Sequence, residues 1–213
     1  CPGATVAHLS GGTSGSSFNV GANTVSFRAT DAAGNTADCS FTVTVLDIQN
    51  PTISCPADII VSNDPSTCGA AVTYSVGVSD NCPGVTASLT SGIASGGLFP
   101  TGTTTAVSFT ATDASNNTAS CSFNVTVNDD DPTFDNCPNS VSLNNDAGDC
   151  GAVHSWATIT ASDNCPGVGV AFISGQNSGS LFPLGATTVL YRATDNFGNT
   201  TDCSFTVTVT DNE

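Results

Sequence analysis

Apolar and polar residues alternate over short stretches of this chain, and none of these stretches has the period of a helix. The alternation occurs in residues 70–80, 105–113 and 121–127. A period of two is typical of half-buried strands. Two further strands are predicted at 55–64 and 85–92, and a turn is predicted at LFPTG, residues 98–102. Short strands separated by turns predict an all-β fold, an antiparallel β-sandwich.

One string occurs three times at a fixed spacing. TDASNNTASC at 112–121 recurs as TDAAGNTADC at 30–39 and TDNFGNTTDC at 194–203, so that Asp31, Asp113 and Asp195 are each 82 residues apart. A fixed period of this size indicates a tandem array of one domain. The predicted domains are a partial repeat (the C-terminal half) at 1–48 and full repeats at 49–130 and 131–213. Cys1 corresponds to a position inside the later copies, so the chain is expected to be a piece of a longer polypeptide.

The repeated string is expected to be a hairpin between the last two strands of each copy. One position of it holds only Gly or Asn, the residues that tolerate positive φ: Gly34, Asn116 and Gly198. The aspartate that begins the string, Asp31, Asp113 or Asp195, has two interpretations. It caps the backbone N–H groups of the turn, or it is a calcium ligand.

Acidic residues far outnumber basic ones. Lys is absent, Arg28 and Arg192 are the only arginines, and with 18 acidic residues the net charge is −16. Such a surface repels nucleic acid and anionic membranes and attracts divalent cations. No apolar run is long enough to span a membrane, so no membrane insertion is expected in this segment.

The acidic residues gather where one copy passes into the next. Asp129, Asp130 and Asp131 precede Pro132, whereas the earlier linker offers only Asp47 with Asn50. The stretch NDDDPTF resembles the acidic linker of cadherins, where calcium stiffens domain junctions. Calcium takes 6–8 oxygen ligands, several of them carboxylates. The candidate ligands are Asp129, Asp130, Asp131, Asp47, Asp113 and Asp195, with Asp64, Asp80 and Asp163 in nearby loops. A solvated acidic linker without an ion is the other interpretation.

Ten cysteines predict a disulfide framework, because no paired C-x-x-C motif indicates zinc. In an alternating sandwich Cys55, Cys82 and Cys121 fall at one pole and Cys68 at the other. The partial copy holds only Cys1 and Cys39, which favours the pair Cys82–Cys121 and its counterparts Cys1–Cys39 and Cys165–Cys203. Cys68 then has two candidate partners, Cys55 within the domain or Cys137 in the next domain. Cys150 is the counterpart of Cys68 in the last copy.

Several motifs together resemble the HYR domain, the hyalin repeat. They are Cys55-Pro56, Asp80-Asn81-Cys82, Phe99-Pro100-Thr101-Gly102, Thr112-Asp113 and Cys121-Ser122-Phe123, and the third copy carries their counterparts. The resemblance implies tandem immunoglobulin-like sandwiches in extracellular adhesion proteins, including large bacterial surface adhesins of the gliding type, and no catalytic role. The cysteines at 68 and 82 depart from the commonest animal pattern.

The predicted function is therefore mechanical: an adhesive segment of a long extracellular fibre, stalk or filament, stapled by disulfides and stiffened by calcium. Expected partners are neighbouring repeats of the same chain and other cell-surface proteins or glycans. No nucleophile–base pattern or phosphate-binding loop is found, and Trp156 and His154 are expected in the core. The alternatives are a glycan- or protein-binding module and a spacer attached to a secreted enzyme.

Overall fold

The fold is that of a computed structural model, which describes residues 3–212. Within these residues the regular elements are strands: β1 Thr5–Ser10, β2 Gly21–Thr30, β3 Thr36–Val45, β4 Thr52–Ser54, β5 Ile59–Ser62, β6 Gly69–Ala71, β7 Gly77–Ser79, β8 Thr86–Ser91, β9 Leu98–Pro100, β10 Thr103–Thr112, β11 Thr118–Asn128, β12 Thr133–Phe134, β13 Val141–Asn144, β14 Gly151–His154, β15 Ala161–Ser162, β16 Gly169–Ser174, β17 Ser180–Pro183, β18 Gly185–Thr194 and β19 Thr200–Thr210. The all-β prediction is confirmed.

Contacts divide the chain into two compact units. The first holds the chain up to Ile53 with Val78–Ser88 and Thr110–Ser120, and the second holds Ser54–Gly77, Leu89–Phe109 and the chain from Cys121 onward. The predicted boundaries at 48 and 130 stay a prediction. Each unit contains one complete acidic linker with the loops beside it, so each shows how one copy joins the next.

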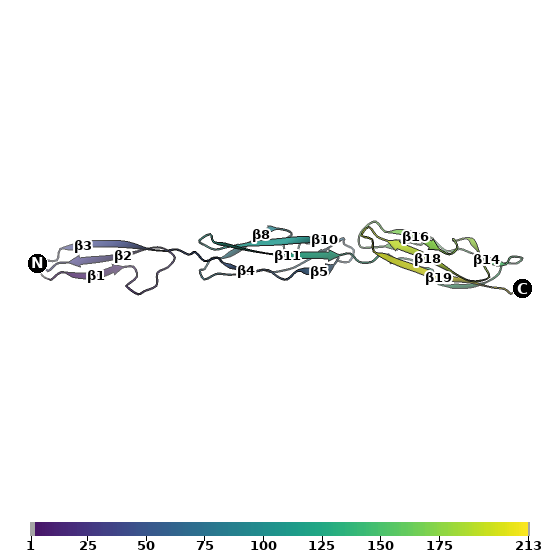
Figure 1. The fold of residues 1–213 in the computed structure, drawn as a ribbon, viewed down its shortest axis with the longest axis horizontal. Coiled ribbons are helices and arrows are strands. Elements are labelled where there is room, and N and C mark those ends of the chain that lie inside the picture. The colour runs from purple at the N-terminus through teal and green to yellow at the C-terminus, as the bar shows by residue number, and fades with distance from the viewer. Residues whose placement is uncertain (1–2, 213) are drawn as a thin grey trace. The chain divides into compact units, whose positions relative to one another are not determined.

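In the first unit, β1, β2 and β3 form an antiparallel sheet in that order (Figure 1). Arg28 of β2 lies opposite Asp38 of β3, and its Nε donates to the carboxylate at 2.7 Å. In the second unit Arg192 and Asp202 form the same pair between β18 and β19, also at 2.7 Å. Both arginines of the chain are therefore engaged on exposed sheet surface, away from the acidic linkers.

The second unit contains a four-stranded sheet, β13-β19-β18-β16, and the short pairs β14-β17 and β12-β15. Its third-copy core holds Phe182, Val189, Phe205 and Val207, and Trp156 packs against them. The Trp156 ring lies edge-on to Phe205 with centroids 4.9 Å apart. Burying each Val or Phe side chain contributes about 1.5–3 kcal/mol. The predicted core role of Trp156 is confirmed, and His154 lies half-buried beside it.

The predicted hairpin is present in every copy. It joins β2 to β3, β10 to β11 and β18 to β19. Its Gly-or-Asn position has positive φ throughout, 86° at Gly34, 68° at Asn116 and 93° at Gly198. This is the left-handed conformation that the substitution pattern predicts.

Two local predictions are wrong. The strand predicted over 70–80 is broken into β6 and β7, which pair in different sheets. Between them, the backbone of Tyr74 donates to and accepts from the Ser95 hydroxyl (2.8 and 2.7 Å) rather than a strand backbone. LFPTG is not wholly a turn, because Leu98–Pro100 forms β9, pairs with β6 and buries Phe99 completely.

The intradomain disulfides differ from the predicted ones. Cys55 bonds Cys121, and Cys137 bonds Cys203, so the predicted Cys82–Cys121 and Cys165–Cys203 pairs are wrong. Cys1 lies outside the described residues, so its bond to Cys39 is not tested.

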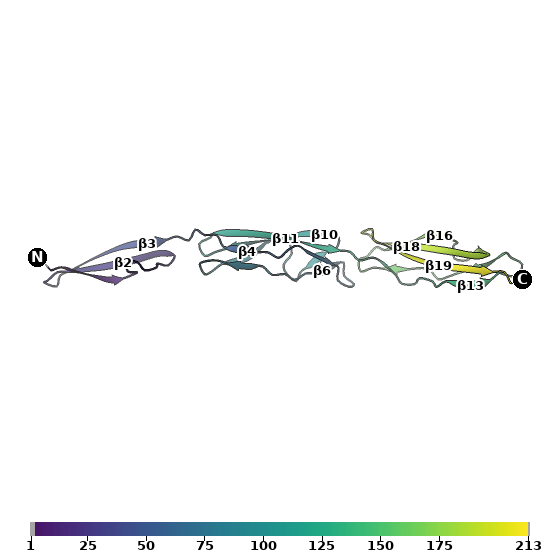
Figure 2. The same cartoon turned by 60° about the horizontal axis from the view of Figure 1, so that its bottom comes forward.

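The reason for these pairings is a parallel strand pair that alternation alone does not reveal. β13 runs parallel to β19, with Val141 opposite Val207 (Figure 2). Four residues earlier on both strands this register brings Cys137 opposite Cys203. β5 and β11 repeat the arrangement, with Ile59 opposite Val125.

Candidate functional site

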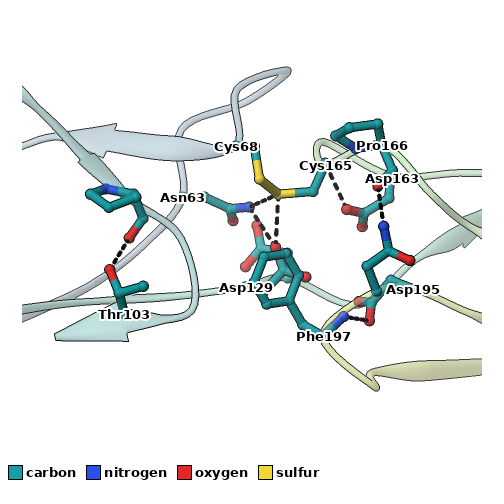
Figure 3. The surroundings of a disulfide bond; sticks show 12 residues. Asn63, Cys68, Thr103, Asp129, Asp163, Cys165, Pro166, Asp195 and Phe197 are labelled. Carbon is teal, nitrogen blue, oxygen red and sulfur yellow. Dashed lines mark hydrogen bonds between the residues drawn. A yellow bond between two sulfur atoms is a disulfide. The ribbon is translucent and has the colours of Figure 1, made fainter.

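The candidate site lies in the second unit, where β11 ends and the third copy begins. Asp129 stands directly after β11 and accepts hydrogen bonds from two amides. Asn63 Nδ2 donates to Asp129 Oδ1 at 3.0 Å, and Asn199 Nδ2 donates to Asp129 Oδ2 at 3.1 Å. Asn63 follows β5 of the second copy, whereas Asn199 ends the hairpin of the third (Figure 3 shows Asn63 and Asp129). Asp129 therefore bridges the two copies.

Two further carboxylates reach this place from turns of the third copy. Asp195 Oδ1 accepts the backbone N–H groups of Phe197, Gly198 and Asn199 at 2.8, 2.7 and 2.9 Å. Asp163 Oδ1 accepts the N–H of Cys165 at 2.8 Å. Both are the first residue of a turn, where Asp binds the backbone two residues on. The capping interpretation of Asp195 is therefore correct at the level of geometry.

The three carboxylates oppose one another's ionisation. Oxygens of Asp129 and Asp163 lie within 4.8 Å, and the side chains of Asp129 and Asp195 share a hydrogen bond. Burial first, and then Asp195 and Asp163, raise the pKa of Asp129 to about 6. The pKa of Asp195 is lowered although burial opposes this, because Asn199 and the turn N–H groups stabilise its charged form. In the absence of a cation Asp129 is the carboxyl that keeps a proton.

A disulfide closes the site. Cys68 of the second copy bonds Cys165 of the third, with Cα atoms 4.6 Å apart and 97 residues between them in the sequence (Figure 3). Both predicted partners of Cys68, Cys55 and Cys137, are wrong, because each is bonded within its own copy. A staple between neighbouring copies, one of the two predicted possibilities, is nevertheless present. Asp129 Oδ1 lies 3.3 Å from the Cys165 sulfur, a contact without a proton because that sulfur carries none.

Unpaired oxygens at the site are suited to a hard cation. Asn63 is only 6% exposed, yet its Oδ1 accepts no hydrogen bond within the described part of the chain. The Oδ1 of Asn164, next to Asp163, is also buried without a donor. A buried acceptor without a partner costs free energy. Carboxylate and amide oxygens are the ligands that calcium prefers, so these residues fit a calcium ion.

The sequence placed too much weight on Asp130 and Asp131. Their side chains are exposed and line a pocket of about 510 Å3 together with Asp163, Pro65 and Ser66. The structure does not bring them into the cluster formed by Asp129 and Asp163. They stay candidate ligands at the rim.

The first unit repeats this arrangement with other residues. Asp47, Asp80 and the Cys82 sulfur lie within 4.8 Å of one another. A hydrogen bond to Asp47, with burial and the charges of Asp47, Asp80 and Asp113, raises the pKa of the Cys82 thiol. Asp113 Oδ1 accepts the N–H groups of Ser115 and Asn117, both at 2.8 Å. Here the cysteine is a thiol and not part of a disulfide.

Asp31 behaves as the other two hairpin aspartates do. Its Oδ1 accepts the N–H groups of Ala33 and Asn35, both at 2.9 Å, so it also caps its turn.

The amides of the site were missed from the sequence. Asn117 and Asn199 end the hairpin strings, and Asn117 Nδ2 donates to the Asp47 carbonyl at 3.2 Å as Asn199 Nδ2 donates to Asp129. Their recurrence every 82 residues, with Asn35, was a signal that could have found them. Nothing in the sequence distinguishes Asn63 from other loop asparagines.

The fold and site define a class: repeated β-sandwich domains joined through acidic, cysteine-containing junctions. The HYR domain family matches residues 2–45, 46–127 and 128–209, and the chain belongs to this family. The predicted family is thus confirmed.

Relatives support the same assignment. Hyalin of Strongylocentrotus purpuratus is 37% identical over 204 residues, which are 92% of this chain and 17% of that protein. "Sushi, von Willebrand factor type A, EGF and pentraxin domain-containing protein 1" of Rattus norvegicus is 34% identical over 166 residues, 76% of this chain and 4% of that protein. The chain therefore spans a small part of the length of these relatives. A Drosophila N-cadherin EC1-3 structure aligns with 89% of this chain and 77% of its own at 12% identity, but its TM-score of 0.36 carries no argument.

These matches identify an extracellular, adhesion-related repeat, and they confirm the predicted location outside the cell or at its surface. The relatives belong to non-enzymatic families. Among the described residues no helix is long and apolar enough to cross a membrane. The comparison with bacterial adhesins stays a prediction.

Proposed function

We propose that the chain is a structural segment of a long extracellular adhesive fibre, in which each junction between copies is made stiff. The disulfide between Cys68 and Cys165 is the observation that carries this proposal. Neighbouring copies joined only by a linker hinge freely, whereas a second covalent connection removes most of that freedom. A binding module has no need for such a connection.

Calcium at the junction is the second part of the proposal. Asp129, Asp163 and the unpaired Oδ1 of Asn63 would hold the ion, with Asp130 and Asp131 at the rim. When bound, calcium supplies the positive charge that lets all of these carboxylates ionise together. The chain has no lysine, and both of its arginines are paired elsewhere with Asp38 and Asp202. Asp195 keeps its oxygens on the turn and orients the hairpin.

Thermal unfolding of the oxidised 213-residue chain with calcium or with chelator tests the ion. An ion that binds only the folded state raises the melting temperature by mass action. We expect a rise of several degrees at millimolar calcium, which Asp129→Asn removes and Asp149→Asn, a change at an exposed aspartate, does not. An unchanged melting temperature in calcium would refute the ion and leave stiffness to the disulfide.

The alternative of a glycan- or protein-binding module gains no support from the exposed aromatic residues. Phe41, Phe172 and Phe197 are exposed, but they occupy different positions in their copies. Phe41 corresponds to Phe123 and Phe205, which are each only 3% exposed. No recurring aromatic platform is formed by the described residues.

A further inference from the structure

The far end of the third copy presents an unpaired cysteine in the same local structure as a paired one. Cys150 lies 82 residues after Cys68, directly before β14, as Cys68 lies directly before β6. Cys68 is bonded to Cys165, whereas Cys150 is an exposed thiol.

The two loops that hold these cysteines have matching hydrogen bonds. Asp64 N donates to the Gly69 carbonyl at 2.7 Å, and Asp146 N donates to the Gly151 carbonyl at 2.7 Å. Asp64 Oδ2 accepts the N–H of Ala71 at 2.8 Å, and Asp146 Oδ2 accepts the N–H of Val153 at 2.9 Å. Cys150 is therefore held as Cys68 is held, with only the partner missing.

A second contact accompanies the disulfide at the junction of the second and third copies. Gly102, the residue before β10, has φ of 69°, and the ring of Phe197 lies 2.4 Å from where a Cβ of residue 102 would be. Phe197 belongs to the hairpin of the third copy. A side chain at 102 would therefore collide with this ring, so a small residue on one copy receives a large one from the next.

The first unit has the opposite distribution of size. Val20 is the residue before β2, and it lines a pocket with Ser115, the hairpin residue that corresponds to Phe197. Large meets small in both junctions, with the sides exchanged. At the end of the third copy the residue before β18 is Leu184, 43% exposed.

We propose that the surface formed by Cys150 and Leu184 docks a further HYR copy that follows in the same polypeptide. Cys150 bonds the cysteine of that copy's Asp-Asn-Cys-Pro motif, the counterpart of Cys165. Leu184 selects a copy whose hairpin carries a small residue at the Phe197 position. Cys82 is the complementary half, a motif cysteine that takes a Cys68-type partner. This inference rests on the tandem organisation and needs neither calcium nor an adhesive role.

The bond forms by thiol oxidation. Two thiols each lose a proton, one S–S bond forms, and the two electrons and two protons pass to a disulfide oxidant such as oxidised glutathione, which becomes two thiols. The compartment fits, because disulfides persist outside the cell.

The test extends the chain by one copy, with residues 1–209 followed by a second copy of 128–213. One version keeps phenylalanine in the added copy at the position of Phe197, and another has serine there. Both are oxidised in a glutathione buffer containing chelator, digested without reduction, and mapped by mass spectrometry. We expect Cys150 bonded to the added motif cysteine in most serine molecules and several-fold fewer phenylalanine molecules. Leu184→Gly, which restores the Gly102–Phe197 combination, is expected to recover the bond in the phenylalanine version.

The Cys68–Cys165 peptide in the same digest reports whether folding and oxidation succeeded. If that peptide is present and Cys150 stays a thiol in the serine version, the docking surface is refuted. Equal bonding in the serine and phenylalanine versions would refute the selective role of Leu184. Bonds of Cys150 to a separate molecule would refute the same-polypeptide partner. Because chelator is present throughout, a failure of calcium binding does not affect the result.

Discussion

The two junctions of this chain use the same carboxylates and differ in one bond. Asp47 and Asp80 lie beside Cys82 in the first unit, and Asp129 and Asp163 lie beside Cys165 in the second. Cys82 is a thiol that hydrogen-bonds Asp47, whereas Cys165 is bonded to Cys68. The acidic cluster therefore forms without the disulfide.

This difference separates what one copy encodes from what two copies encode. The linker aspartate, the Asp-Asn turn and the hairpin asparagine are set by local hydrogen bonds, such as Cys82 N to Asp80 and Cys165 N to Asp163. The disulfide and the Asn63–Asp129 hydrogen bond need a neighbour with a matching loop. Stiffness is thus a property of the pair of copies, while the capacity to attract a cation belongs to each junction.

Removing the disulfide should have the largest effect. Cys68→Ser with Cys165→Ser opens a loop of 97 residues, and the chain-entropy model gives a loss of about 4 kcal/mol in the free energy of unfolding. Cys82→Ser, at the matching position of the first unit, is expected to change little because Cys82 makes no such bond. Calorimetry of the oxidised chain measures both. Equal losses would contradict the distinction between the junctions.

The size of the residue at 102 should have the next effect. Gly102→Val collides with Phe197 and forces a β-branched residue to positive φ, at a cost of roughly 1–3 kcal/mol. Adding Phe197→Ser recreates the Val20 and Ser115 combination of the first unit and should recover the part due to collision. The backbone part should remain, because φ at Val20 is not positive. A double-mutant cycle by urea unfolding tests this, and strictly additive losses would argue against the contact.

Much of this could be predicted from the sequence, and the misses have physical causes. Alternation and the 82-residue period identify strands and copies, and the Gly34, Asn116 and Gly198 pattern locates the left-handed turn. The disulfides were missed because parallel pairing of β13 with β19 leaves no mark in alternation. The site was predicted at Asp129 but not at Asn63, since the contact joins residues 66 apart.

The pH dependence of stability in chelator should distinguish Asp129. Its folded pKa, about 6, lies above the reference value of 3.8, so between these values the folded state holds a proton that the unfolded state lacks. Stability therefore falls as pH rises from about 4 to about 6 and then levels off. Asp129→Asn should flatten this slope in a series of melting temperatures. The cap aspartates act in the opposite direction: the pKa of Asp195 is lowered, so its contribution is lost below about pH 4. A slope unchanged in Asp129→Asn would assign it to other groups.

The two arginine pairs should have the smallest effect, and an equal one in both units. Arg28→Ala and Arg192→Ala each remove a two-pronged ion pair on exposed sheet surface. Exposed pairs contribute little because water and salt screen them. We expect melting temperatures close to that of the parent chain in both variants, converging fully in 1 M salt. The calcium-dependent rise should be unchanged, because Arg192 pairs with Asp202 and not with the junction. A rise that grows only in Arg192→Ala would mean that this arginine competes with the cation, and the charge argument for the site would then need both partners of Arg192.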